Sequence, residues 1–435
     1  MEGAKDFDAL VLGAGIAGIQ AALDLAEQGF KVALVEAGPS IGGKMIQLSK
    51  VFPTLDCASC ITTPKMAQVA HHPDISIYTL CQLKEVKGDD DSFRVRITQQ
   101  PRYVDVEKCI GCMKCELACP VMVPAEEQGG FAARKAIYIP FSNAIPQVPR
   151  LEVENCIACG RCSKVCPAES IDYFQKPTDF NLNVKAIVLC TGYSLNKEYP
   201  RKAWGDFGEQ PNLIDAFQME RMLAPTSPYQ RLLRPSDGKE PENVAFIQCA
   251  GSRDVQLGVP HCSRVCCMYN IKQAILITRE LPQTQCTIYC MDKRCFGKGY
   301  EQFYLTAKEL GIEFINAKAV VTGRGDDDSV IIRHENMESM TGVQIKSHDL
   351  VVLSLAIVPA WQPDGTMRVQ VSSDGFIASS KPQLAPTLTN SKGIFMAGAV
   401  AGPKDIVDTV VEAGAAASEA AIYLRRLKSS SSKAA

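Results

Sequence analysis

The sequence predicts an α/β protein made of two strand–helix–strand units, the first of which is interrupted by a cysteine-rich insertion. Three observations support this fold class. A short apolar strand near the N-terminus runs into a glycine turn and an alanine-rich helix. A second strand–helix–strand pattern begins near residue 243, and the segment between the two units repeats one cysteine pattern twice. With 435 residues, the chain is long enough for two or three domains.

The first unit carries a dinucleotide-binding turn, Gly13-Ala-Gly15-Ile-Ala-Gly18, between its first strand and a helix expected over 19–28. Gly13 permits the tight turn, Gly15 lets the backbone approach a pyrophosphate, and Gly18 lets the helix pack closely on the strand. The next strand ends on Glu36, where a carboxylate can bind a ribose hydroxyl. Together these features predict a site for FAD or NAD.

Two later segments favour FAD over NAD. The strand that ends in Thr191-Gly192 resembles a signature of two-dinucleotide flavoproteins, and the segment from Gly393 to Gly398 resembles their closing flavin motif. The Asp that usually follows the last glycine of that motif is missing here, so either Asp405 makes the contact with the ribityl chain or the contact is dispensed with. An alanine-rich helix expected over 406–424 directs its N-terminus toward the flavin.

The insertion contains the pattern CxxCxxCxxxCP twice, which is typical of ferredoxins with two 4Fe-4S clusters. Three cysteines of each run wrap one cluster, and the fourth, which precedes proline, binds the other cluster. We assign one cluster to Cys109, Cys112, Cys115 and Cys166, and the second to Cys156, Cys159, Cys162 and Cys119. Zinc sites and buried thiols are the alternatives, but zinc sites usually pair CxxC units and do not require four-cysteine runs.

The second unit lacks a glycine-rich phosphate turn. Its first strand ends in Cys249-Ala-Gly-Ser-Arg, so direct reduction by NAD(P)H is disfavoured. Cys262, Cys266 and Cys267 follow at the start of a helix expected over 265–280, where they share roughly one side. They are either ligands of a third metal centre together with Cys249 or a group of buried thiols.

One further pair of cysteines, Cys57 and Cys60, forms a CxxC that is either a redox disulfide or a pair of packed thiols. We favour packed thiols, because the surrounding loop shows neither an aromatic nor a helical context.

Composition argues against several classes of function. The formal net charge is −2, so no strong basic field indicates binding to nucleic acid or to an anionic membrane. The N-terminus has no secretion signal, and no apolar run reaches the roughly 18 residues of a membrane span. Nineteen cysteines in such a chain are better explained as reduced ligands than as a disulfide framework. We therefore expect a cytoplasmic protein without direct membrane insertion.

Several long sequence segments resemble the A-type subunits of heterodisulfide reductase. They are Ile41-Gly-Gly43-Lys44-Met-Ile-Gln, Phe52-Pro-Thr-Leu-Asp-Cys-Ala-Ser-Cys60, Phe246-Ile-Gln-Cys-Ala-Gly-Ser-Arg-Asp254 and Ala401-Gly-Pro-Lys-Asp-Ile406. The resemblance implies a thioredoxin-reductase-like, two-dinucleotide-binding flavoprotein with an inserted two-cluster ferredoxin domain. It also implies cofactor contacts from Gly43 and Lys44, and a lysine near flavin N5 that corresponds to Lys272. The third 4Fe-4S cluster that it implies is held by Cys249, Cys262, Cys266 and Cys267.

By the same resemblance, the FAD-binding domain comprises residues 1–100, 179–242 and 361–435, the ferredoxin domain 101–178, and the second Rossmann-like domain 243–360. We expect a short form without the family's extra N-terminal domain and C-terminal ferredoxin domain. The implied function is electron transfer between a flavin and 4Fe-4S clusters, with flavin-based electron bifurcation as one mode.

The implied partners are heterodisulfide reductase B- and C-like subunits and a ferredoxin-like or hydrogenase-linked subunit that delivers electrons, with the chain itself a homodimer within the larger complex. Two rival functions share the same motifs. One is a subunit of a quinone-interacting or sulfur-metabolism complex, and the other is an NAD(P)H-dependent iron–sulfur flavoenzyme resembling the small subunit of glutamate synthase. The missing phosphate turn at Cys249 argues against the second rival.

Overall fold

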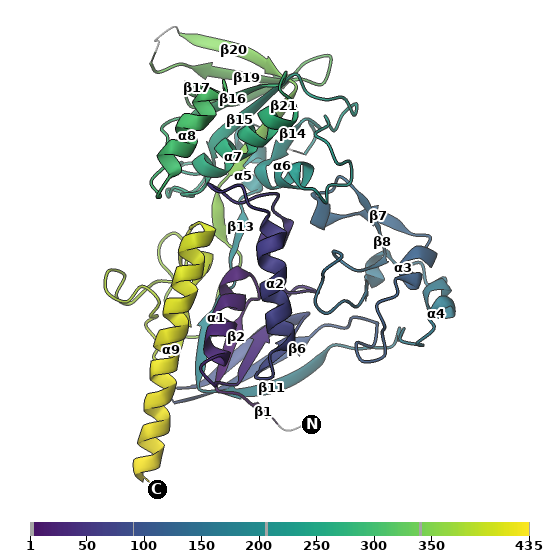
Figure 1. The fold of residues 1–435 in the computed structure, drawn as a ribbon, viewed down its shortest axis with the longest axis vertical. Helices are drawn as coiled ribbons and strands as arrows, with labels where there is room; N and C mark the ends of the chain where they lie inside the picture. The colour runs from purple at the N-terminus through teal and green to yellow at the C-terminus, as the bar shows by residue number, and fades with distance from the viewer. Residues whose placement is uncertain (1–3, 90, 205–207, 339–341, 435) are drawn as a thin grey trace.

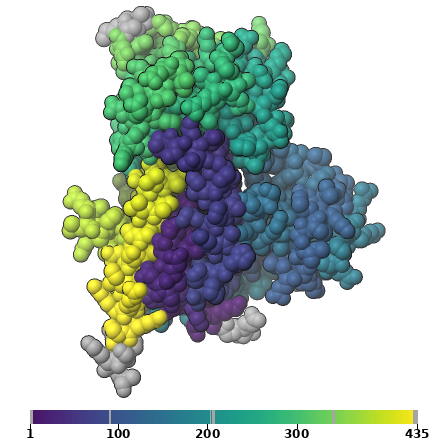
Figure 2. All heavy atoms as spheres, viewed as in Figure 1, coloured from purple at the N-terminus to yellow at the C-terminus, as the bar shows by residue number. Residues whose placement is uncertain are grey.

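The computed structural model describes residues 4–434 apart from 90, 205–207 and 339–341. Two α/β units lie one above the other, and the cysteine-rich insertion projects from the side of the lower unit (Figure 1). The space-filling view shows the N-terminal end of α2 (Ala58–His71) reaching up to the second unit, which is drawn in green (Figure 2).

A five-stranded parallel sheet with the strand order β23-β12-β2-β3-β4 forms the centre of the lower unit. These strands are β2 (Ala9–Leu12), β3 (Val32–Val35), β4 (Ile75–Tyr78), β12 (Ala186–Leu189) and β23 (Ile394–Met396). β2, β3, β12 and β23 are buried throughout, as expected for a parallel sheet that is covered on both faces. On one face, α1 (Ile16–Ala26) packs against α9 (Ile406–Ala434).

The other face of this sheet packs against a mixed layer with the strand order β1-β11-β6-β5, in which β1 pairs with β11 in parallel and the other neighbours are antiparallel. The layer comprises β1 (Lys5–Asp6), β5 (Cys81–Asp89), β6 (Ser92–Gln99) and β11 (Thr178–Val184). β6 alternates exposed and buried residues, which is typical of a strand with one solvated face. Apolar residues of both layers form one core, so the unit has three layers.

The insertion leaves this layer at Gln99 and returns at Thr178, and these two residues are register partners. Its elements are short. They are α3 (Lys114–Ala118), α4 (Arg161–Val165), β7 (Met122–Pro124), β8 (Ala133–Lys135), β9 (Ile137–Tyr138), β10 (Arg150–Leu151), η2 (Glu126–Gln128) and η3 (Val153–Asn155). Because the two ends meet on neighbouring strands, the insertion adds to the sheet without breaking it.

The upper unit is built on a parallel sheet with the strand order β14-β21-β15-β16-β17. Its strands are β14 (Leu213–Asp215), β15 (Asn243–Ala250), β16 (Gln285–Cys290), β17 (Glu313–Asn316) and β21 (Leu350–Leu355). Its helices are α6 (Ala216–Leu223), α7 (Cys266–Glu280) and α8 (Tyr300–Glu309). An antiparallel sheet of β18 (Val320–Arg324), β19 (Val330–Glu335) and β20 (Val343–His348) lies at its far end (Figure 1).

Two antiparallel strands, β13 (Tyr193–Leu195) and β22 (Ile357–Pro359), connect the units. The remaining short elements are η1 (Met45–Gln47), α5 (Glu198–Trp204) and η4 (Gly398–Ala401). Two predicted helix boundaries were wrong. The first helix begins at Ile16 rather than residue 19, because Gly15 is its extended N-cap, and the last helix continues beyond residue 424 to Ala434.

Candidate functional site

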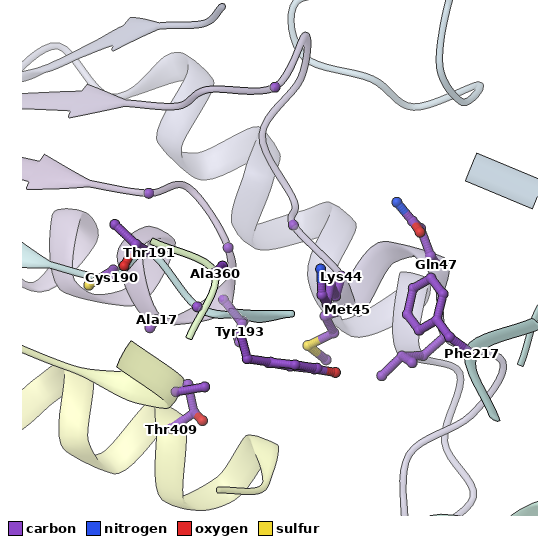
Figure 3. Close-up of a pocket in the computed structure, with 18 of the residues that line it drawn as sticks. Ala17, Lys44, Met45, Gln47, Cys190, Thr191, Tyr193, Phe217, Ala360 and Thr409 are labelled. Carbon is purple, nitrogen blue, oxygen red and sulfur yellow. The ribbon is translucent and has the colours of Figure 1, made fainter. Parts of the chain in front are cut away.

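One cavity of about 870 Å³ lies where the two units and the insertion meet. Its volume falls within the range of cofactor pockets. In Figure 3, Tyr193 and Met45 lie between Thr409 of α9 on one side and Phe217 of α6 with Gln47 on the other. The cavity is therefore walled by segments that are far apart in the sequence.

Most of the predicted cofactor residues line this cavity. They are Gly13, Gly15, Glu36, Gly43, Lys44, Thr191, Gly192, Lys272 and Asp405. Gly18 and Gly398 lie behind its wall, where they allow close packing. A Cβ atom on Gly18 would meet the carbonyl oxygen of Gly13 at 1.8 Å, and one on Gly398 would meet the Cβ of Ala17 at 2.8 Å.

The glycine turn forms a bare backbone cradle at one end of the cavity. Gly43 has a φ of +58°, and a Cβ there would come within 2.7 Å of the Cα of Gly15. Gly13 has a φ of +99° and lies against the carbonyl of Cys190. Because α1 has no side-chain cap at its N-terminus, its first N–H groups are available to an anion. The cradle fits a pyrophosphate.

Two polar side chains flank the cradle. Glu36 accepts hydrogen bonds from the backbone N–H groups of Ala14 and Gly38, both at 2.8 Å, so its carboxylate braces the turn. The Thr191 hydroxyl is buried and has no hydrogen-bond partner within the described part of the chain. An unpaired buried hydroxyl at a cofactor cavity indicates a ligand that would satisfy it. These features fit FAD.

Further along the cavity, Lys44 lies over the ring of Tyr193, with its Nζ 5.3 Å from the ring centroid. Burial lowers the pKa of Lys44, and nearby Lys197 lowers it further. Burial also raises the pKa of Tyr193, so this phenol stays protonated. Lys44 thus places a partly desolvated cation at the middle of the cavity.

Lys272 reaches the same cavity from α7 and forms a buried ion pair with Glu220 of α6, at 2.5 Å. Lys272 is 2% exposed and Glu220 is 3% exposed. The Lys272 ammonium also donates to the carbonyl oxygen of Lys50 at 2.8 Å, and Ser49 donates to Glu220 from both its N–H and its hydroxyl. The pair therefore ties two helices of the upper unit to a loop of the lower unit.

The electrostatics of this pair keep Glu220 ionised. Burial alone would raise the pKa of Glu220, but Lys272, Ser49 and Gln273 together hold it below its ordinary value. Burial lowers the pKa of Lys272, and Glu220 opposes that shift. The lysine predicted to lie near the flavin is thus neutralised by a carboxylate.

Asp405 has partners of its own. Its carboxylate accepts a hydrogen bond from the Tyr300 hydroxyl at 2.6 Å and another from the backbone N–H of Asp408 at 2.8 Å in the first turn of α9. It lines the cavity while it caps this helix. Its contact with a ribityl chain stays a prediction.

The two ferredoxin runs adopt matching conformations. α3 packs against α4, and each helix is preceded by a left-handed residue, Met113 and Gly160. Cys115 and Cys162 are buried in one small core, which Cys109, Cys119 and Cys156 partly cover. Backbone N–H groups donate to the sulfurs of Cys109 and Cys156 in equivalent positions.

Cys166 is hydrogen-bonded within its own run, where its N–H donates to the Ser163 carbonyl, and is also linked to the first run. Ser170 donates its backbone N–H to the Cys166 sulfur at 3.4 Å, and its carbonyl accepts from Asp105, whose carbonyl in turn accepts from Cys109. The crossed ligand assignment, in which Cys166 completes the first cluster, stays a prediction. Cys112 and Cys159 are exposed.

The third group of cysteines gathers where β15 meets α7. Cys249 occupies a β-bulge with a φ of +57°, which re-aims its side chain. The prediction that Cys262 lies on the helix with Cys266 and Cys267 was wrong, because α7 begins at Cys266 and Cys262 lies in the preceding loop. Burial, together with the neighbouring Cys249 and Cys262, raises the pKa of Cys266 to about 12. A cationic metal centre would offset both effects.

Within the described residues, no group of three or more His, Cys, Asp or Glu side chains is arranged to hold a single metal ion. The four cysteine ligands of a 4Fe-4S cluster bind different iron atoms, so their sulfurs stand further apart than the ligands of one ion. Four-iron ligand sets therefore remain the prediction for all twelve cysteines.

The preference for packed thiols at Cys57 and Cys60 was wrong, since the structure pairs them in a disulfide with a Cα–Cα distance of 5.2 Å. The segment also has a helical context, which the sequence did not reveal. Cys57 is the N-cap of α2, and Cys60 lies in the first turn of that helix.

Sequence reasoning also missed parts of the cavity wall. Glu220 had no motif to mark it, and the insertion supplies Glu126, Glu127 and Phe141. Buried Arg102 anchors the insertion by donating to the carbonyl oxygens of Val148 and Pro39 and to the hydroxyl of Thr79. The ferredoxin segment is thus joined to the cavity by direct hydrogen bonds.

These features fit an iron–sulfur flavoprotein, and two family models agree with them. A model described as FAD dependent oxidoreductase matches residues 8–45, and one described as 4Fe-4S dicluster domain matches residues 108–171. The fold is similar to thioredoxin reductase from T. acidophilum, with a TM-score of 0.53, 15% identity, and coverage of 96% of this chain and 98% of that one. Thioredoxin reductase from Lactococcus lactis gives a TM-score of 0.51 at 14% identity, with coverage of 97% and 99%. The predicted fold class is confirmed.

More specifically, the chain is similar to the A-type subunits of heterodisulfide reductases. It is 47% identical to the second iron-sulfur A-type protein of the CoB--CoM heterodisulfide reductase of Methanopyrus kandleri, over 96% of this chain and 64% of the relative. It is 42% identical to the A-type protein of the H(2):CoB-CoM heterodisulfide,ferredoxin reductase of Methanothermobacter marburgensis, with the same coverage. The chain thus spans 64% of the length of these relatives. No described helix has the length and apolar character to span a membrane.

Proposed function

We propose that this chain is the flavin- and iron–sulfur-bearing subunit of a heterodisulfide reductase-type complex, in which electrons pass between FAD and 4Fe-4S clusters. The observation that carries this proposal is the shared cavity. Its walls combine the dinucleotide turn, the ferredoxin insertion, and the helix that begins with Cys266 and Cys267. Segments that belong to the same elements as both groups of candidate cluster ligands thus line one proposed flavin site.

FAD, when bound, supplies the exchange between electron pairs and single electrons. The residues of the chain position it. Gly15, Gly43 and the N-terminus of α1 bind the pyrophosphate, Glu36 faces the ribose, and the Thr191 hydroxyl gains the partner that it lacks. Lys272, held by Glu220, presents its ammonium at the far end of the cavity. Asp405 contacts the ribityl chain from the start of α9.

The second unit, on this proposal, holds a third cluster in place of a nicotinamide nucleotide. A loop of residues 251–265 separates β15 from α7, where a nucleotide-binding unit would have a tight glycine turn. The loop folds back on itself, since the N–H of Val259 donates to the carbonyl of Gly251 at 2.7 Å. It delivers Cys262 beside Cys249, Cys266 and Cys267.

The partners in this proposal are B- and C-like subunits and a ferredoxin-like or hydrogenase-linked donor, with the chain as a homodimer and with bifurcation at the flavin. The domain boundaries in this proposal place the insertion at residues 101–178. The second unit comprises β14 and α6 as well as residues 243–360, because β14 pairs with β21 of its sheet, so the predicted start at residue 243 was too late. We place the protein in the cytoplasm.

A reductive titration tests the electron path. Anaerobically purified protein is titrated with dithionite while flavin absorbance and the cluster EPR signals are followed. Both should respond within one titration, and NADH or NADPH alone should not bleach the flavin at a catalytic rate. Rapid bleaching by either nucleotide would overturn the proposed role of the second unit.

A further inference from the structure

The Cys57–Cys60 disulfide stands apart from the other cysteines. The described residues include all nineteen cysteines, and the other seventeen form no disulfide. The disulfide joins residues only three apart in sequence. So short a loop removes less chain entropy from the unfolded state than a long one, and the bond is therefore a weak structural brace. In reducing compartments, disulfides of this kind are more often redox-active than structural.

The surroundings of the pair favour a stable thiolate on Cys57. Its sulfur caps the N-terminus of the fourteen-residue helix α2 and accepts a hydrogen bond from the N–H of Cys60 at 3.2 Å. The Ser59 hydroxyl lies 3.5 Å from the same sulfur. Helix N-termini stabilise negative charge, so Cys57 is the better leaving group when the disulfide opens.

Access is from solvent and not from the cavity. Cys60 is exposed and Cys57 is half-buried. Lys50, whose backbone pairs with Cys57 in an antiparallel bridge, lines the cavity, while neither cysteine is among the described residues that line it. The disulfide therefore contacts the wall of the proposed flavin site only through the backbone bridge between Cys57 and Lys50, and its exposed side faces solvent.

We propose that Cys57 and Cys60 form a thiol–disulfide exchange site that takes an electron pair from an external dithiol. A thiolate of the dithiol attacks the Cys60 sulfur, forms a mixed disulfide, and releases Cys57 as a thiolate. The second thiolate of the dithiol then displaces Cys60, which takes up a proton. The dithiol becomes a disulfide, and its two electrons remain on the Cys57 and Cys60 sulfurs. This chemistry does not depend on the proposed electron path through the flavin and clusters.

The test uses the cluster-loaded full chain under anaerobic conditions. The protein is equilibrated with dithiothreitol at graded ratios of reduced to oxidised reagent, quenched in acid, alkylated and digested with trypsin. Cleavage after Lys50 and Lys65 gives one peptide that contains only Cys57 and Cys60. As the proportion of reduced dithiothreitol rises, the mass of this peptide should change from that of the disulfide form to that of the doubly alkylated form. Raising the proportion of oxidised reagent again should restore the disulfide form.

A second tryptic peptide, residues 280–293, provides an internal control. It carries Cys286 and Cys290, which are buried free thiols. The mass of this peptide, measured after alkylation under denaturing conditions, should show both thiols alkylated at every ratio. A change there would mean that the oxidised reagent reaches and oxidises buried thiols, so the response of Cys57 and Cys60 would not be specific.

Two single variants test the assigned roles of the sulfurs. The reaction of iodoacetamide at pH 7 is followed at Cys57 in Cys60→Ser and at Cys60 in Cys57→Ser. Each rate is divided by the rate of the same thiol in the unfolded chain. The normalised rate of Cys57 should be several-fold higher than that of Cys60. Equal normalised rates would overturn the assignment of Cys57 as leaving group.

Two outcomes would overturn the proposal as a whole. If the disulfide resists excess reduced dithiothreitol until the protein unfolds, the bond is structural. If photoreduction of the bound flavin, without any added thiol, opens the disulfide at least as fast as dithiothreitol does, its electrons come through the cavity instead.

Discussion

The buried pair of Lys272 and Glu220 gives the most specific prediction about how the two units are held together. The Glu220 carboxylate accepts four hydrogen bonds, two from Ser49, one from Lys272 and one from Gln273. Glu220→Gln preserves the shape of the side chain but turns one oxygen into an amide nitrogen. Whichever oxygen is replaced, two donors lose their acceptor, and the Lys272 ammonium stays buried without a countercharge.

Breaking a buried ion pair by removing one partner costs about 3–5 kcal/mol. We therefore expect Glu220→Gln to lower the free energy of unfolding of the upper unit by this amount, measured from urea midpoints at constant m-value. The loss in free energy of unfolding should become smaller between pH 7 and pH 9. A buried lysine without its partner has a lowered pKa, so a growing fraction of it is the neutral amine as pH rises, and the neutral amine costs less to bury.

Two companion variants make this experiment decisive. Glu309→Gln removes an exposed carboxylate at the end of α8 and should change stability by no more than about 0.5 kcal/mol. In the double variant Glu220→Gln/Lys272→Met, no charge is left unpaired, so its loss should be smaller than the sum of the two single losses. Additive losses, or a loss below about 1 kcal/mol for Glu220→Gln, would refute the proposed role of this pair.

Three further predictions concern other residues. Thr191→Val should weaken FAD binding by roughly 0.5–1.5 kcal/mol, or about 2- to 10-fold in the dissociation constant measured by flavin fluorescence, because the hydroxyl loses its cofactor partner; unchanged affinity would contradict this. Gly18→Ala should abolish folding and FAD retention, judged by soluble yield and flavin absorbance, since its Cβ would lie 1.8 Å from the Gly13 carbonyl oxygen, whereas Gly323→Ala meets only an ordinary contact at 3.7 Å and should be tolerated. Burial lowers the pKa of His348 from 6.5 to about 4, so stability present above pH 6.5 should be lost toward pH 4 at about 1.4 kcal/mol per pH unit, and His348→Gln should flatten this slope in urea unfolding.

Local patterns made the glycine turn and the cysteine runs predictable from sequence. The turn needs glycines at fixed spacings because backbone atoms approach there, and a cluster needs thiols at short intervals along a tight loop. Both requirements act within about ten residues, where sequence spacing determines geometry.

Contacts between distant elements were not predictable. Glu220 and Lys272 are 52 residues apart in sequence and lie on two different helices, and no sequence pattern around either residue predicts their contact. The disulfide was missed for a different reason. Pro64 follows two threonines and marks a break in the sequence, yet α2 tolerates it in its second turn, and this hid the helix start that brings Cys57 and Cys60 together.

The most direct test of the central claim is the ratio of iron to FAD in anaerobically purified protein. Three 4Fe-4S clusters and one flavin predict about twelve iron atoms per FAD, and Cys266→Ala should reduce this to about eight without loss of flavin. A wild-type value of about eight, unchanged in that variant, would contradict the third cluster and with it the proposed role of the second unit.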